Sequence, residues 1–137
     1  MVVARSVNET FQYVCHSDRQ LPQDQQTTFI LRRLPATVGM ALDNLHEATQ
    51  TGQVTLRVGD QRIVTLQAGL AGWTNFNDAQ GAPIEFKHEH GVRSVYGITV
   101  KNPAKVEMID YLPEEIAEEL ARAIVEGNQL SEDDAKN

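Results

Sequence analysis

Residues 69–86 combine large aromatic rings with glycines, and this combination constrains the fold more than any other stretch of the chain. The segment contains Trp73, the only tryptophan, together with Phe76, Phe86 and three of the nine glycines. Rings of this size need burial, either in the domain itself or against a partner protein. We expect a loop that turns around Trp73 and presents partner-binding anchors, with burial in the domain's own core as the alternative. The expected anchors are Leu70, Trp73, Phe76 and Phe86.

The length of the chain indicates a single domain over residues 1–137, large enough to close a core without disulfides or metal. Cys15 is the only cysteine, so no intrachain disulfide can form. An isolated thiol is more often a small buried hydrophobe than a nucleophile. Residues 1–4 are apolar but too short to fold alone, so we expect residues 1–9 to form a flexible arm that orders on assembly. Residues 128–137 are expected to form an acidic tail.

Charge is distributed unevenly along the chain. The total is −7, but residues 1–106 carry a balance of +1 and residues 107–137 a balance of −8. General nucleic-acid binding needs a concentrated basic face, so this distribution argues against it. The acidic region suits a basic protein partner or serves solubility. No apolar run approaches the roughly 20 residues that span a membrane, and we expect the chain to work in the cytoplasm or in something assembled there.

Alternation of apolar and polar residues predicts several strands. Residues 10–15 and 27–33 are expected to pair as antiparallel strands. Residues 54–58 and 62–66 flank a short glycine-containing connection at 59–61, which predicts a β-hairpin.

A further strand is expected over residues 92–100. Gly97 is then the site of a bulge, and Asn102 with Pro103 ends the strand.

Two segments carry apolar residues at helical spacing. A mid-chain helix is expected after Pro35 and should stop at Gly52. A C-terminal helix is expected to begin at Pro113 and to stop at Gly127, with the charged residues Glu118, Glu119, Arg122 and Glu126 facing water. The sequence therefore predicts an α+β fold: an antiparallel β-sheet with hairpins, one mid-chain helix and one C-terminal helix. The apolar stripes are Val38, Leu42, Leu45 and Ala48 in the first helix and Ile116, Leu120, Ala123 and Ile124 in the second.

No motif in the chain is specific for catalysis. His88 and His90 lie two residues apart and could share a metal, but a closed zinc site needs about four ligands, so a solvated polar loop is the expected structure. The glycines at 69–72 lack the companions of a phosphate-binding loop. We therefore expect no catalytic residues, no metal site and no cofactor.

One long pattern resembles small proteins encoded among the head and tail morphogenesis genes of tailed bacteriophages. The pattern is Leu70-x-Gly72-Trp73-x-Asn75-Phe76-x-Asp78-x-x-Gly81-x-x-Ile84-x-Phe86. In those proteins it is similarly preceded by a segment like Gln26-Thr27-Thr28-Phe29-Ile30-Leu31-x-x-Leu34 and a helix with an acid such as Asp43. It is followed by a helix similar to Leu112-Pro113-Glu114-Glu115-x-x-x-Glu119-Leu120-Ala121-x-Ala123-Ile124 and an ending like Leu130-Ser131-Glu132-x-x-x-Lys136-Asn137.

The resemblance implies a non-enzymatic structural protein that binds capsid, neck or tail proteins. Such a protein works in the virion, in a multi-copy assembly put together in the host cytoplasm. Some tail-assembly chaperones share a shorter Trp…Asp-x-x-Gly…Phe core, so a cytosolic chaperone is the alternative. A small metal-dependent hydrolase that uses His88 and His90 is a remote alternative.

Overall fold

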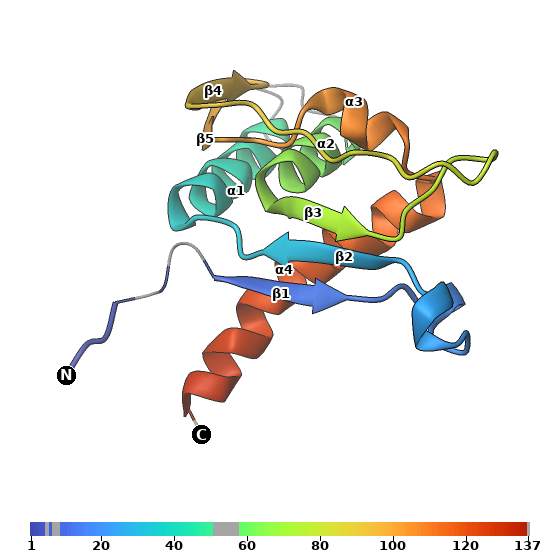
Figure 1. Cartoon of the computed structure of the whole chain (residues 1–137). Helices are drawn as coiled ribbons and strands as arrows, with labels where there is room; N and C mark the ends of the chain where they lie inside the picture. The colour runs from blue at the N-terminus through green and yellow to red at the C-terminus, as the bar shows by residue number, and fades with distance from the viewer. Residues whose placement is uncertain (5, 7–8, 51–57, 137) are drawn as a thin grey trace.

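The computed structural model describes residues 1–4, 6, 9–50 and 58–136, and their side chains except those of 45–50, 58 and 128–136. In this part of the chain four α-helices accompany a three-stranded and a two-stranded antiparallel sheet, which confirms the predicted α+β fold. Figure 1 shows α4 crossing the three-stranded sheet and emerging beyond β1.

The larger sheet has the order β1 (Thr10–Tyr13), β2 (Thr28–Arg32), β3 (Leu70–Thr74). The first two strands pair antiparallel, as predicted, with Tyr13 opposite Phe29. In β2, alternate residues are buried, and Phe29 with Leu31 provides the core side of the sheet. Residues 70–74 form the strand β3, where the sequence predicts part of the aromatic loop.

The mid-chain helix is confirmed as α1 (Ala36–Gln50), directly after Pro35, whereas its expected stop at Gly52 lies outside the described residues. The hairpin expected over residues 54–66 is wrong where the structure describes it, because α2 (Val58–Gly69) is a helix.

The reason for this error lies in the burial of α2. Every residue from 64 to 70 is buried, including the polar Thr65 and Gln67. Thr65 donates its hydroxyl to the carbonyl of Gln61, and Gln67 donates its amide to the carbonyl of Ala104. A helix covered on most sides lacks a polar face, so its hydrophobic residues show no 3.6-residue period. Its run of β-branched residues then predicts a strand.

The strand expected over residues 92–100 is instead a hairpin of β4 (Val92–Val95) and β5 (Ile98–Lys101). The two residues between the strands, Tyr96 and Gly97, have φ angles of 49° and 80°. Positive φ at both central positions is the geometry of a tight hairpin turn, so Gly97 serves a turn and not a bulge. The strand end at Asn102 and Pro103 is confirmed, and the short helix α3 (Val106–Asp110) follows.

The C-terminal helix α4 (Glu114–Lys136) follows Pro113 as predicted. Leu120 and Ile124 of its apolar stripe are fully buried. The expected stop at Gly127 is wrong, since the helix continues to Lys136. A Cβ at Gly127 would lie 2.7 Å from Cζ of Phe11, so this glycine allows β1 to approach the helix closely.

The packing of α2 on α4 can be tested at Gly69. A Cβ at Gly69 would lie 2.6 Å from Cδ1 and Cγ2 of Ile124, so this fully buried side chain would have to shift. We expect Gly69→Ala to lower the free energy of unfolding by about 1–3 kcal/mol, measured by urea denaturation.

Gly39→Ala is the matched control, because a Cβ there meets nothing within 4 Å among the described residues. Because Gly39 lies inside α1, we expect Gly39→Ala to raise the free energy of unfolding by about 0.5–1 kcal/mol. Equal effects of the two substitutions would contradict the close packing of α2 on α4.

Candidate functional site

The aromatic residues of the expected loop form a cluster inside the domain. Trp73 on β3 is 8% exposed and donates its Nε1–H to the carbonyl of Ile84 at 2.7 Å. Its ring meets those of Phe76 and Phe86 edge-on, with centroids 4.8 and 5.0 Å apart. Phe29 of β2 closes the cluster at 5.5 Å from Phe76. Edge-to-face pairs at these spacings are mutually stabilising, so the rings serve as each other's partners.

This burial corrects the expected anchor set. Leu70 is fully buried and Trp73 nearly so, and both belong to the core instead of the surface that a partner would meet. Phe76 and Phe86 are partly buried against the same core. Between these two rings the chain makes a turn, in which Asp78 Oδ1 accepts the backbone N–H groups of Gln80 and Ala82.

Substitution of Trp73 tests whether it is a core residue. We expect Trp73→Ala to destabilise the isolated domain by about 3–5 kcal/mol, because it removes a buried ring from a closed cluster. Trp73→Phe keeps a ring but loses the hydrogen bond to Ile84, so it should lower the free energy of unfolding by less than Trp73→Ala does. Urea unfolding followed by circular dichroism measures both. An unchanged stability of Trp73→Ala would place the ring at the surface.

A second cluster joins the end of β1 to α4 through a single carboxylate oxygen. Glu119 Oε2 accepts hydrogen bonds from the Tyr13 hydroxyl at 2.7 Å and from the backbone N–H of His16 at 3.0 Å. His16 Nδ1 lies 2.8 Å from the same oxygen. The expectation that Glu119 faces water is therefore wrong, since its side chain is only 19% exposed.

The cluster changes the acidity of its members. Partial burial raises the pKa of Glu119, but hydrogen bonds from Tyr13 and His16 outweigh it and hold the pKa below its ordinary value. Burial, together with Glu119, raises the pKa of Tyr13 to about 12 and that of Cys15 to about 12. Cys15 is thus a buried thiol, as predicted, and not the thiolate that a nucleophilic cysteine requires.

Sequence reasoning missed this cluster because Glu119 is more than 100 residues away from Tyr13 and His16 along the chain. In α4, Glu119 stands next to Glu118, which is exposed and pairs with Arg122 in the ordinary i,i+4 manner at 3.2 Å. Nothing in the sequence distinguishes the two glutamates. Only the approach of β1 to the helix does so.

The lowered pKa of Glu119 predicts a pH dependence of stability. The carboxylate stabilises the fold above its unfolded pKa of about 4.3, and this stabilisation is lost as the pH falls through the lower folded value. We expect Glu119→Gln to lower the free energy of unfolding at pH 7 by about 1–3 kcal/mol. The difference between variant and wild type should shrink as the pH falls below the unfolded pKa and through the lower folded value, as measured by urea denaturation across pH.

Glu118→Gln is the control for this experiment, with an expected change within about 0.5 kcal/mol at pH 7. If Glu119→Gln behaves like Glu118→Gln, the cluster does not stabilise the fold.

His88 and His90 lie beside an open hollow lined also by Lys87, Arg93 and Lys105. Their rings are 5.0 Å apart, so the structure does bring the two imidazoles together. Within the described ranges, however, no group of three or more His, Cys, Asp or Glu side chains is arranged to hold a metal ion.

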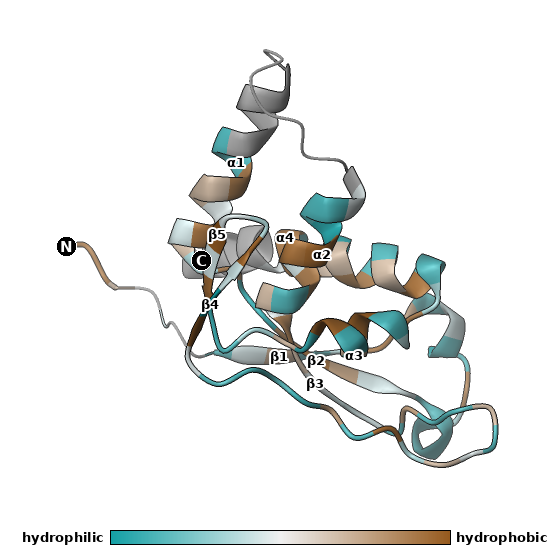
Figure 2. Cartoon of the chain, turned by 90° about the horizontal axis from the view of Figure 1, so that it is seen from above, coloured by the Kyte–Doolittle hydropathy of each residue, from teal (hydrophilic) through white to brown (hydrophobic). Residues whose placement is uncertain are grey.

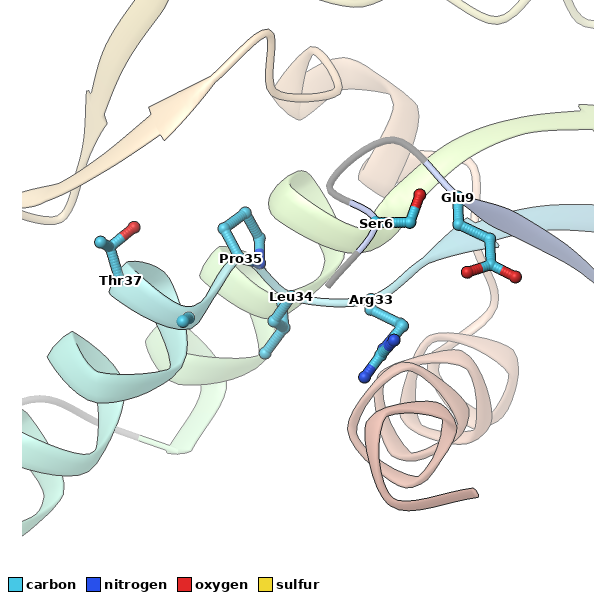
Figure 3. A pocket seen from close by; sticks show the side chains of 7 residues that line it. Ser6, Glu9, Arg33, Leu34, Pro35 and Thr37 are labelled. Carbon is cyan, nitrogen blue, oxygen red and sulfur yellow. The ribbon is translucent and has the colours of Figure 1, made fainter. Parts of the chain in front are cut away.

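A groove of about 410 Å³ lies where β2 leads into α1, and we call it the α1 groove. It is lined by residues 33–37 together with Ser6 and Glu9. Figure 3 shows Ser6 and Glu9 beside β1, Pro35 and Thr37 at the start of α1, and the Arg33 side chain pointing away from Glu9. The Nε of Arg33 is buried and has no hydrogen-bond partner among the residues that the structure describes.

Residues 1–4 extend away from the domain and are apolar (Figures 1 and 2). Met1, Val2 and Val3 have exposed fractions of 116%, 98% and 80%. Burying one such side chain contributes about 1.5–3 kcal/mol, so three in a row are a substantial unused source of binding free energy. We call residues 1–4 the apolar arm.

In the part of the chain that the structure covers, no helix has the length and apolar character needed to cross a membrane. No protein-family model, curated protein or solved structure was found to match this chain.

Proposed function

We propose that this chain is a non-enzymatic structural protein of a tailed bacteriophage, which binds capsid, neck or tail proteins in the virion. The observation that carries the proposal is the apolar arm, whose residues Met1, Val2 and Val3 are almost completely exposed. Consecutive exposed apolar side chains mark interaction sites in proteins that work in assemblies. The order of motifs around Trp73, which resembles phage morphogenesis proteins, supports the same function.

The outer face of α4 supplies a second surface that suits this function. Glu114, Glu115, Glu118 and Glu126 are exposed there, whereas Glu119 turns inward to Tyr13. An acidic helix face complements a basic surface on a neighbouring protein and raises the rate of encounter with it. The aromatic cluster then has a structural role: it holds the domain in shape while the arm and the acidic face meet partners.

The hydrolase alternative finds less support than the structural one. Two imidazoles provide too few ligands for a closed or catalytic zinc site, which uses three or four protein ligands. A tail-assembly chaperone would use the same surfaces as a virion protein but would leave before the particle is complete.

Mass spectrometry of purified particles separates these functions. We expect this chain in the particles at a fixed ratio to the major capsid protein, in multiple copies. Its presence in infected-cell lysate but absence from particles would identify a chaperone instead.

Incorporation also tests the arm. We expect a chain carrying both Val2→Asp and Val3→Asp to be depleted from particles at least about tenfold, because aspartate cannot be buried in an apolar contact. Val106→Asp is the control, since Val106 is 51% exposed at the start of α3, away from the arm. Normal incorporation of the arm variant would remove the arm from the proposed interface.

A further inference from the structure

We infer that a basic hollow between the end of β2, residues 85–93 and the start of α3 binds a phosphate group, either free or carried by a small ester. The hollow gathers basic side chains from three separate parts of the chain: Arg32, Lys87, Arg93 and Lys105. The inference concerns a ligand site and is independent of the function proposed above.

The basic hollow consists of two neighbouring parts. The larger part, of about 450 Å³, is lined by the exposed Lys87 and Arg93 and by the half-buried Lys105. The smaller part, of about 170 Å³, is lined by Arg32. His88 is among the residues that line both parts, so the two lie side by side. A ligand at His88 therefore has the Arg32 guanidinium on one side and the other cations on the other.

Arg32 supplies a partly buried cation without a counterion. Its Nε–H donates to the carbonyl of Ala68 at 3.0 Å and its Nη2 donates to the carbonyl of Asn102 at 3.1 Å, and both acceptors are neutral. A guanidinium has five N–H donors, so further donors remain for a ligand. Within the described ranges, no carboxylate forms an ion pair with this side chain.

The environment of Arg32 favours an anion. Burial lowers the pKa of Arg32, as expected for a cation that is withdrawn from water. Burying a charge is costly unless the charge is paired. An anion bound beside the guanidinium would provide the pairing that the fold itself does not.

The basic hollow is positive although the whole chain carries a net charge of −7. Glu85 and Glu89 also line its larger part, so four basic side chains face two carboxylates, a balance of +2. Among the residues that the structure describes, neither glutamate forms an ion pair with these cations. The imidazoles of His88 and His90 add further N–H donors. A phosphate group accepts hydrogen bonds from several directions, and arginine with lysine is its usual partner in proteins.

Backbone hydrogen bonds hold the walls of the basic hollow in place. The N–H of Lys105 donates to the carbonyl of Lys87 at 3.1 Å, and the N–H of Asn102 donates to the carbonyl of Gly91 at 2.8 Å. Arg32 is fixed to the same segment through the carbonyl of Asn102. The backbone of the site is therefore ordered before an anion binds, which lowers the entropy that binding costs.

An NMR titration of the ¹⁵N-labelled full chain with sodium phosphate, at constant pH and ionic strength, tests the site. We expect saturable shifts of the Arg32 Nε–H and of the backbone N–H groups in residues 87–91 and 102–105. Sodium chloride at the same ionic strength should not produce them. Shifts that do not saturate, or that chloride reproduces, would show a general salt effect and overturn the inference.

Two matched pairs of substitutions locate the site. Lys87→Gln with Arg93→Gln changes only exposed side chains, and it should raise the dissociation constant for phosphate at least about tenfold. Arg62→Gln with Arg122→Gln removes the same charge from another hollow, between α2 and α4, and should change the constant less than about twofold. Equal weakening by both pairs would mean that only the overall charge attracts phosphate, which contradicts a site in the basic hollow.

Phenyl phosphate and benzoate identify the ligand chemistry. Phe86 lines both parts of the basic hollow and can contact a phenyl ring. If phenyl phosphate shifts the same signals as inorganic phosphate, the site takes a phosphate ester; if inorganic phosphate alone does so, the site takes the free anion. Either result supports a phosphate site. Benzoate carries the same ring on a carboxylate, and binding of benzoate as tight as that of phenyl phosphate would overturn the assignment to phosphate.

Discussion

The burial of Trp73 is the constraint on which the arrangement of this domain depends. The indole ring sits on β3, and its Nε1–H needs a buried acceptor, which the carbonyl of Ile84 provides. To bring that carbonyl into place, residues 75–84 must leave β3, turn through the Asp78 region and return over the ring. Phe76 and Phe86 are carried back with the same segment and close the cluster. Residues 75–86 therefore fold back over Trp73 and keep the aromatic cluster buried.

The position of β3 in turn requires α2 and α4 to approach each other. The helix α2 ends at Gly69 and β3 begins at the next residue, so Ile124 of α4 packs where a side chain at Gly69 would stand. At the opposite edge of the sheet, Gly127 allows Phe11 of β1 to reach the same helix, and Glu119 accepts hydrogen bonds from the end of β1. With the rings and these helix contacts turned inward, our proposed function assigns partner binding to the apolar arm and the outer face of α4.

The sequence predicted those elements whose signal is local. The strands β1 and β2 alternate at period two, and Pro35 and Pro113 mark the starts of α1 and α4. The predictions are wrong where contacts with residues distant in the chain decide the structure. The helix α2 is buried on most sides, and Gly127 faces Phe11 instead of ending a helix. Composition could not decide which way Trp73 points, and the cluster around Glu119 has no sequence signature.

Fluorescence of Trp73 tests the central claim most directly, because it is the only tryptophan and no substitution is needed. The account requires that the native chain emits at shorter wavelength than the urea-unfolded chain and that acrylamide or iodide quenches it weakly, since the indole is 8% exposed. Quenching should rise only as the whole domain unfolds. Native emission and quenching equal to those of the unfolded chain would contradict the account and return Trp73 to the surface as a partner anchor.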